Sequence, residues 1–137
     1  MKKLKNILSI SMVAFIMLNI SASLAANTSD TGWSFKFSRA TFNQYTPARV
    51  KQDASPVYFY VDNIEGNSIK VRVLAGNGDS SSYTPYVYIS KPGKYCVSSN
   101  VYEDGYRKAL VHGQKYNRFS TSTSYGLWSP DSWSCGW

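Results

Sequence analysis

The chain has 137 residues, of which 43% are hydrophobic, and carries 15 Lys and Arg against eight Asp and Glu. This length fits one domain with enough chain to bury a modest core. Beyond the N-terminal segment, the basic residues are spread out and Arg107-Lys108 is their only adjacent pair, which argues against a nucleic-acid-binding protein.

The N-terminal segment has the features of a secretory signal peptide. Three lysines among the first five residues precede 7–20, an uncharged and mostly apolar stretch. That stretch is shorter than the ~20 residues of a membrane span. Residues 23–25 (Ser-Leu-Ala) then give a small-x-small cleavage pattern before Ala26. We therefore predict a signal peptide over 1–25 and a secreted, extracellular protein that is either released or held non-covalently at the cell surface. A cut before Asn27 and a retained anchor helix are the alternatives.

Residues 26–137 are predicted to form a single mature domain. The signal peptide removes three basic residues and no acidic one, so twelve basic and eight acidic residues remain, a formal charge of +4. This charge favours contact with an anionic cell-wall polymer or an anionic membrane surface, although spread charge is also typical of an ordinary solvated surface. The chain contains four Trp and 11 Tyr, which indicates a core rich in aromatic rings.

The first predicted strands follow from alternation of apolar and polar residues. Trp33, Phe35 and Phe37 alternate with polar residues, which is typical of a half-buried strand. Residues 57–61 form a short run of strand-forming residues, and 69–74 alternate again. The segment between these two runs contains Gly66 and predicts a hairpin connection over residues 62–67.

The second half of the chain continues the same pattern. Strands are predicted over 86–89 and 94–98. Asp104-Gly105 is the strongest hairpin signal, leading into a strand over 106–111. Residues 120–124, rich in Ser and Thr, predict a connection to the C-terminal tail. About seven short strands without a sustained helical period predict an all-β fold, an antiparallel β-sandwich of the Ig-like or jelly-roll-like kind.

Cys96 and Cys135 are the only cysteines. In an exported protein this even number predicts a disulfide, which ties the C-terminal tail to a strand near the middle of the chain. Two free thiols are the alternative in an organism with a weak oxidation system. Two cysteines and one histidine are too few for a closed zinc site, which needs four ligands, so we expect no metal and no cofactor.

Few residues offer catalytic chemistry. His112, the only histidine, is expected at the end of a strand, at the surface or a sheet edge. No Ser lies in a G-x-S-x-G motif, and a disulfide would consume the thiol of a Cys96–His112 pair. Glu103 and Asp104 are neighbours in a predicted turn and do not supply the separated carboxylates that a glycosidase uses. The sequence predicts no catalytic residues and a protein that is not an enzyme, with a small hydrolase as an alternative.

The C-terminal tail concentrates tryptophan, with Trp128, Trp133 and Trp137 within ten residues. One interpretation is that these side chains cap an open end of the sandwich, held there by the disulfide. The other is that they form an exposed binding surface, either an interfacial belt or a platform on which sugars stack.

Several turn and aromatic motifs resemble a known family. Residues 101–106 (Val-Tyr-Glu-Asp-Gly-Tyr), 109–110, Gly113 and 126–132 (Gly-Leu-Trp-Ser-Pro-Asp-Ser) resemble the C-terminal half of a family of small secreted proteins of Gram-positive bacteria whose function is unknown. The resemblance covers roughly residues 50–133 and implies secretion without supplying functional residues. The signal segment, the Trp-led strand and the aromatic C-terminus are also similar to lactococcin-972-like bacteriocins, small exported β-sandwich proteins that act on the envelope of related cells.

These observations together predict a secreted, non-enzymatic protein that contacts the bacterial cell envelope. A bacteriocin-like antimicrobial protein is the alternative. Exposed aromatic side chains beside basic residues would mark an envelope-binding surface.

Overall fold

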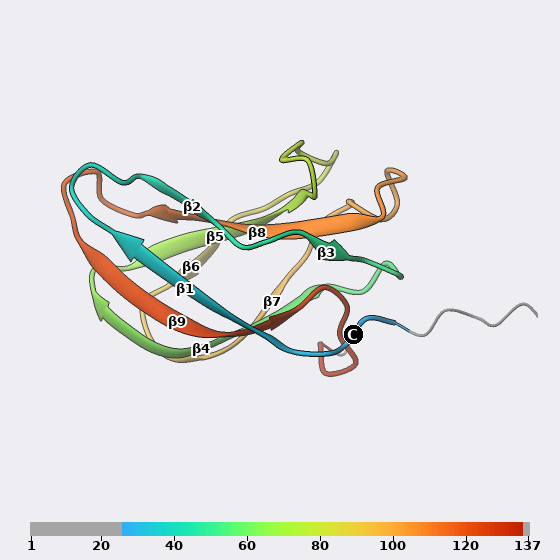
Figure 1. Cartoon of the computed structure of the whole chain (residues 1–137), viewed down its shortest axis with the longest axis horizontal. Coiled ribbons are helices and arrows are strands. Elements are labelled where there is room, and N and C mark those ends of the chain that lie inside the picture. The colour runs from blue at the N-terminus through green and yellow to red at the C-terminus, as the bar shows by residue number, and fades with distance from the viewer. Residues whose placement is uncertain (1–25, 136–137) are drawn as a thin grey trace, which may run out of the picture.

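The computed structural model describes residues 26–135, and Figure 1 shows this part of the chain as two antiparallel sheets packed face to face. The predicted all-β sandwich is confirmed, with nine strands in the described range instead of about seven. Neither sheet closes on itself. The predicted signal peptide, 1–25, lies outside the described residues. Within residues 26–135, no helix is long and apolar enough to span a membrane.

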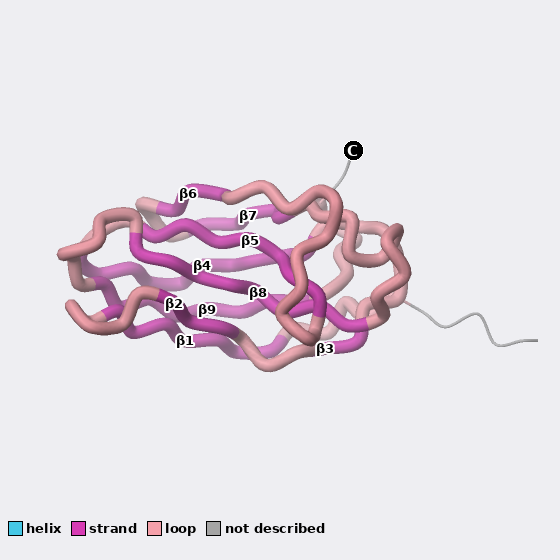
Figure 2. The backbone as a smooth tube through the Cα atoms, turned by 90° about the horizontal axis from the view of Figure 1, so that it is seen from above, coloured by secondary structure: helices cyan, strands magenta, loops and turns pink. Residues whose placement is uncertain are grey.

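Each sheet is built from strands that are distant in sequence. The four-stranded sheet has the order β1 (Thr31–Phe37), β9 (Ser122–Ser129), β4 (Val57–Gly66) and β7 (Gly93–Val97). The five-stranded sheet has the order β2 (Asn43–Tyr45), β8 (Lys108–Lys115), β5 (Ile69–Ala75) and β6 (Val87–Ile89), and β3 (Arg49–Val50) also pairs with β8. Figure 2 shows the two layers from above, one behind the other.

The strand directions give the sandwich two different ends. The terminal end carries the residues where the described chain enters and leaves, together with the connections at 51–56, 76–86 and 98–107. The distal end, on the left in Figure 1, is formed by four loops, 38–42, 67–68, 90–92 and 116–121.

The aromatic side chains of β1 form the centre of the core. Trp33, Phe35 and Phe37 are buried and alternate with exposed residues, as predicted. The Trp33 ring stacks on Phe59 of β4 with their centroids 4.3 Å apart. Each such buried side chain contributes roughly 1.5–3 kcal/mol, so β1 supplies much of the apolar stabilisation of the four-stranded sheet.

A glycine allows the two sheets to approach each other. A Cβ atom at Gly113 of β8 would lie 2.6 Å from the Phe35 ring of the opposite sheet. The ring therefore rests directly on the backbone of β8. A larger residue at this position would push the layers apart.

The hairpin predicted over residues 62–67 is wrong. Consecutive strands β4 and β5 lie in different sheets, so this segment ends β4 and then carries the chain across the sandwich. β4 continues to Gly66 because it pairs with β9, with an irregularity in the register between Val61 and Asn63. The run of strand-forming residues predicted the first half of β4 and alternation predicted β5, but neither signal determines which strands pair.

The hairpin predicted at Asp104-Gly105 is also wrong. The backbone N–H of Tyr106 donates to the Val101 carbonyl oxygen, and that of Gly105 to the Tyr102 carbonyl oxygen. Gly105 has a positive φ of 94°. This is the hydrogen-bond pattern with which a helical turn ends on glycine. The turn connects β7 and β8, which lie in different sheets.

The connection predicted at residues 120–124 is only partly correct, because 120–121 lie in a loop and 122–124 begin β9. β9 is a central strand, paired with β1 on one side and β4 on the other. Ser122 and Ser124 are buried opposite Phe37 and Phe35 of β1. These small side chains leave room for the neighbouring rings, so a polar sequence forms an interior strand.

We expect Gly126→Ala to lower the free energy of unfolding by about 3 kcal/mol, as overpacking of a tight interior does. Gly126 lies in β9 between Trp33 and Val61. An added Cβ would overlap the carbonyl oxygen of Tyr60, and backbone cannot move aside as a flexible side chain can. Urea unfolding of the mature domain measures the effect.

Gly32→Ala is the matched control for this prediction. Gly32 lies on the neighbouring strand, and a Cβ there would meet only the Gly126 carbonyl oxygen at 3.9 Å, an ordinary contact. Equal stability of the two variants would contradict the packing assigned to Gly126.

Candidate functional site

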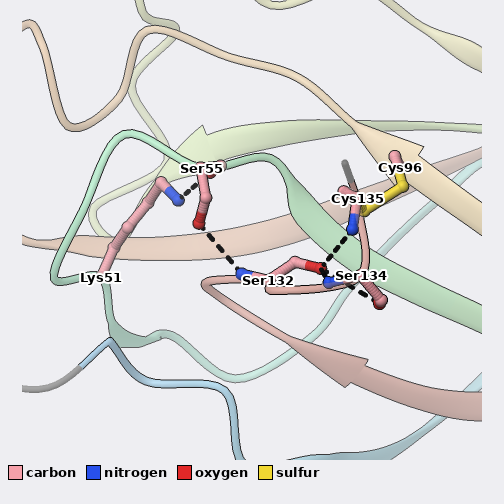
Figure 3. Close-up of a disulfide and its surroundings, with 6 residues drawn as sticks. All are labelled: Lys51, Ser55, Cys96, Ser132, Ser134 and Cys135. Atoms are coloured by element: carbon pink, nitrogen blue, oxygen red, sulfur yellow. Dashed lines mark hydrogen bonds between the residues drawn. A yellow bond between two sulfur atoms is a disulfide. The ribbon is translucent and has the colours of Figure 1, made fainter. Parts of the chain in front are cut away.

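The predicted disulfide is present between Cys96 and Cys135, which lie 39 positions apart in the sequence (Figure 3). It ties the tail that follows β9 to β7, an edge strand of the four-stranded sheet. The Ser132 hydroxyl accepts hydrogen bonds from the backbone N–H groups of Ser134 and Cys135, at 3.2 and 3.1 Å. The disulfide thus fastens the tail to the sheet, and the Ser132 hydroxyl holds the turn within the tail.

The predicted tryptophan surface is divided by the structure. Trp128 is completely buried on β9 beside Phe59, so its assignment to an exposed binding surface is wrong. β9 turns this side chain inward because it continues the core face of the sheet. Trp133 is 81% exposed on the disulfide-bound tail. Trp137 lies outside the described residues.

An open cleft of about 280 Å³ adjoins Trp133 at the terminal end. Burial, and then the nearby carboxylate of Asp30, raises the pKa of the Tyr58 phenol, which therefore stays protonated and able to donate a hydrogen bond. An exposed indole beside hydroxyl groups and a carboxylate provides stacking and hydrogen bonding for a polar ring. The lining residues are Thr28, Asp30, Tyr58, Ser129, Asp131, Ser132, Trp133 and Ser134.

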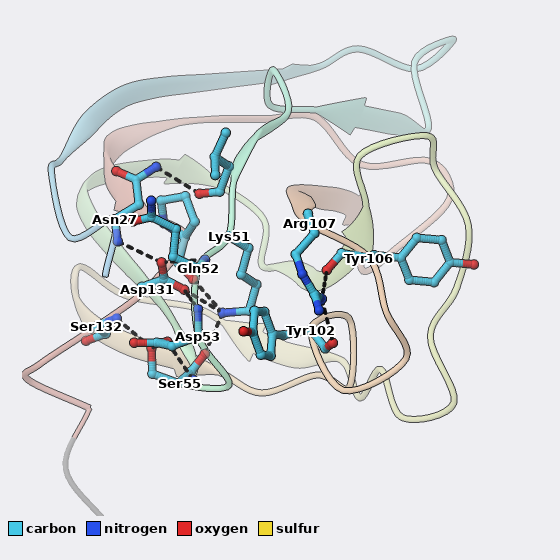
Figure 4. A network of polar contacts seen from close by, with 12 residues as sticks. Asn27, Lys51, Gln52, Asp53, Ser55, Tyr102, Tyr106, Arg107, Asp131 and Ser132 are labelled. Atoms are coloured by element: carbon cyan, nitrogen blue, oxygen red, sulfur yellow. Dashed lines mark hydrogen bonds and ion pairs between the residues drawn. The ribbon is translucent and has the colours of Figure 1, made fainter. Parts of the chain in front are cut away.

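Asp131, which lines this cleft, forms a buried ion pair with Lys51 (Figure 4). The Lys51 ammonium lies 3.1 Å from Asp131 Oδ1, and both side chains are almost completely buried. Lys51 Nζ also donates to the carbonyl oxygens of Ser55 and Pro130, at 2.6 and 2.8 Å. All three donor positions of the ammonium are therefore used, which is what a buried charge requires.

The Asp131 carboxylate also gathers backbone N–H groups from two other segments. Oδ2 accepts from the N–H of Asn27 at 2.7 Å and of Gln52 at 2.9 Å. The N–H of Asp131 donates back to the Asn27 carbonyl oxygen. Asp131 thus joins the start of the described chain, the loop after β3 and the tail, which assigns it a structural role.

The outer face of the five-stranded sheet presents cations beside an aromatic ring. The Lys70 ammonium lies 4.5 Å and the Arg72 guanidinium 4.8 Å from the centre of the Tyr86 ring. Such contacts hold cations in place while leaving them able to meet an anion. The five strands of this sheet contain neither Asp nor Glu.

His112 lies at the centre of this face and is buried, so its expected place at the surface or a sheet edge is wrong. β8 extends to Lys115, beyond the predicted strand end, and carries the ring into the sheet. His112 Nδ1 accepts from Arg72 Nε at 3.1 Å, and Nε2 lies 2.9 Å from Asn43 Oδ1. Tyr45 stacks on the ring with centroids 4.7 Å apart. Because both ring nitrogens make these contacts, His112 holds the side chains of Arg72 and Asn43 in place.

We expect His112 to make stability depend on pH. Burial, followed by the charges of Arg72 and Lys70, lowers its pKa from 6.5 to about 4. Between these values the unfolded chain binds a proton and the folded chain does not, so stability falls as the pH falls from 6.5 towards 4. The loss is about 2–3 kcal/mol.

His112→Gln removes this contribution and leaves the remaining titrating groups in place. The difference in unfolding free energy between wild type and variant should shrink as the pH falls through this window. Urea unfolding at pH 7, 5.5 and 4 measures it, and a difference that stays constant would contradict the lowered pKa.

Comparison with known protein families gives a match over most of the chain. The family model "Protein of unknown function (DUF2712)" matches residues 21–132. The chain belongs to the DUF2712 family. No curated protein and no solved structure matches it. The resemblance to a family of unknown function is confirmed by this match, which extends further towards the N-terminus than residues 50–133. The Gram-positive origin and the likeness to bacteriocins stay predictions.

The matched residues include two groups of polar contacts that the sequence did not predict. One is the Lys51–Asp131 ion pair, and the other is the set of contacts around His112 on the five-stranded sheet. Asp131 belongs to the Trp-Ser-Pro-Asp-Ser segment that carried the resemblance, and this was the one available signal for it. Among residues 26–135, no cluster of three or more His, Cys, Asp and Glu side chains is placed to hold a metal ion.

Proposed function

We propose that this DUF2712 protein is an exported, non-enzymatic protein that binds an anionic polymer of the cell envelope through the outer face of its five-stranded sheet. The observation that carries the proposal is the pairing of Lys70 and Arg72 with Tyr86 on a sheet without carboxylates. Tyr86 is half-buried, and an aromatic ring beside basic residues suits contact with an anionic envelope polymer.

The distribution of charge over the whole domain supports this choice of face. Six of the eight carboxylates lie in segments at the terminal end, and the other two, Asp62 and Glu65, lie in β4 of the opposite sheet. An anionic polymer approaching the five-stranded sheet therefore meets cations without nearby repulsion. The six are Asp30, Asp53, Asp79, Glu103, Asp104 and Asp131.

The chemistry of the face favours a polymer that combines phosphate with hydroxyl-bearing units. Lys70 and Arg72 supply charge-assisted donors for phosphate oxygens. Tyr45, which is exposed above His112, supplies a ring for apolar contact. Gln114 Nε2 donates to Asn43 Oδ1 at 2.8 Å, and this bond fixes the polar groups between the two aromatic positions.

The test measures binding of the oxidised domain, residues 26–137, to purified poly(glycerol phosphate) and to isolated bacterial cell walls. Lys70→Gln/Arg72→Gln should weaken both interactions at least tenfold, because both cations leave the face. Binding should also weaken as salt is raised, since exposed charges are screened. Cell walls stripped of phosphate polymers with hydrofluoric acid should no longer retain the wild type.

The matched control is Lys36→Gln/Lys94→Gln, which removes two exposed cations from the four-stranded sheet. It changes the net charge equally and should leave binding within about twofold, since Debye screening at 0.15 M confines each charge to roughly 8 Å. Equal losses in the two double variants would reject the assigned face. Loss of binding in Trp133→Ala alone would move the site to the cleft at the terminal end.

A further inference from the structure

The distal end of the sandwich exposes an unusual amount of aromatic surface. Phe119 is 79% and Tyr116 65% exposed, and Tyr88 and Phe42 are also exposed. The rings of Tyr88 and Tyr116 meet edge to face with centroids 5.6 Å apart. They border an open pocket of about 240 Å³. Large side chains that gather at one exposed end of a small domain mark a contact surface.

The distal loops carry cations and no carboxylate, and the carboxylate nearest to them in sequence is the exposed Glu65 near the end of β4. Arg39, Lys91 and Arg118 lie in the four distal loops, whose sequences contain no Asp or Glu. Arg39 and Arg118 come from different loops and line one open depression of about 430 Å³ together with Phe42. Basic and aromatic groups are therefore interleaved at the tip.

Buried contacts hold the loops in this arrangement. Lys115, which is almost completely buried at the end of β8, donates from Nζ to the carbonyl oxygens of Ser38 and Arg39, at 2.7 and 3.2 Å. The N–H of Tyr116 donates to the Ser68 carbonyl oxygen at 3.2 Å. The loop that carries Phe119 is therefore anchored at its base, and its exposed ring is presented on a fixed support.

We propose that the distal end docks on an anionic lipid surface. Aromatic side chains favour the boundary between water and the acyl region, and basic side chains beside them attract anionic headgroups. Phe119 and Phe42 enter this boundary while Arg39 and Arg118 contact headgroup phosphates. The proposal rests on the proposed export and envelope contact. Its basic and inserting side chains lie in the distal loops and not on the polymer-binding face, which the patch adjoins at Tyr88 beside Lys70, and its partner is different.

The experiment is co-sedimentation of the oxidised domain, residues 26–137, with vesicles of phosphatidylglycerol and phosphatidylcholine, and with vesicles of phosphatidylcholine alone. The wild type should bind the anionic vesicles at least tenfold more strongly. Phe119→Ser/Tyr116→Ser should reduce this binding at least tenfold, and so should Arg39→Glu/Arg118→Glu. All four side chains lie in loops, and thermal unfolding checks that the variants are folded.

The controls change side chains of the same chemistry elsewhere on the surface. Tyr83→Ser removes an exposed ring at the terminal end, and Lys94→Glu/Lys108→Glu reverses two exposed cations outside the distal loops. Both should retain vesicle binding within about threefold. Absence of wild-type binding to anionic vesicles, or equal losses in distal and control variants, would overturn the proposal. Lys70→Gln/Arg72→Gln should keep vesicle binding while losing polymer binding, which separates the two proposals.

Discussion

Asp131→Asn is expected to lower the free energy of unfolding by about 3–5 kcal/mol, the cost of breaking a buried ion pair from one side. The variant leaves the Lys51 ammonium buried without its counter-charge. It also weakens the acceptor for the backbone N–H groups of Asn27 and Gln52, so the three segments joined at the terminal end separate more easily. Urea unfolding at pH 7 gives the value.

The double variant Asp131→Asn/Lys51→Met provides the decisive comparison. Removing both charges leaves no unpaired ion, so the double variant should lose less than the sum of the two single losses. Asp30→Asn, an exposed carboxylate at the same end, should change stability by less than about 0.5 kcal/mol. Additive losses in the double variant would show that the two charges are not coupled.

Replacing both cysteines, Cys96→Ser/Cys135→Ser, is expected to lower the free energy of unfolding by about 4 kcal/mol. The bond joins residues 39 positions apart in the sequence. Closing a loop of that length lowers the conformational entropy of the unfolded chain, which stabilises the folded state by about 4 kcal/mol. Unfolding of the oxidised domain with and without a reducing agent should give the same difference.

Trp133→Ala is the control for the disulfide prediction. This exposed side chain lies on the same tail, and its loss should cost less than about 0.5 kcal/mol because little surface is returned to water. A wild type that unfolds at the same urea concentration before and after reduction would show that the bond does not contribute to stability.

Local patterns in the sequence predicted those elements whose signals are local. Alternation at Trp33, Phe35 and Phe37 predicted β1, because one face of that strand is buried and the other is wet. The even number of cysteines, read together with the predicted export signal, predicted the disulfide, because thiols pair in an oxidising compartment. Neither signal depends on knowing which strands lie side by side.

Features that depend on distant partners could not be predicted in this way. β9 begins with a polar Ser-Thr-Ser segment, which lies inside the sheet because the aromatic side chains of β1 pack beside its serines. The Asp104-Gly105 pair supplies a positive φ, which serves a hairpin and a helix end equally well. Lys51 and Asp131 are 80 residues apart, and each is tolerated in the interior only because the other is there.

The candidate binding face also depends on residues that are distant in sequence, so the sequence did not predict it. The +4 charge suggested an anionic partner, but the position of Lys70 and Arg72 over Tyr86 needs the pairing of β5 with β6 and β8. The sequence gives no sign that Trp128 and Trp133 differ. Trp128 is buried because it lies on β9 with its side chain towards the core, whereas Trp133 follows the strand and is exposed.

The most direct test of the central claim is a nuclear magnetic resonance titration of the isotope-labelled, oxidised domain with poly(glycerol phosphate). Binding at the proposed face predicts that the largest changes in amide chemical shift fall on Lys70, Arg72, Tyr86 and Gln114. Their neighbours on β5 and β8 should follow with smaller changes. Changes confined to the cleft beside Trp133, or no change at saturating polymer, would contradict the account.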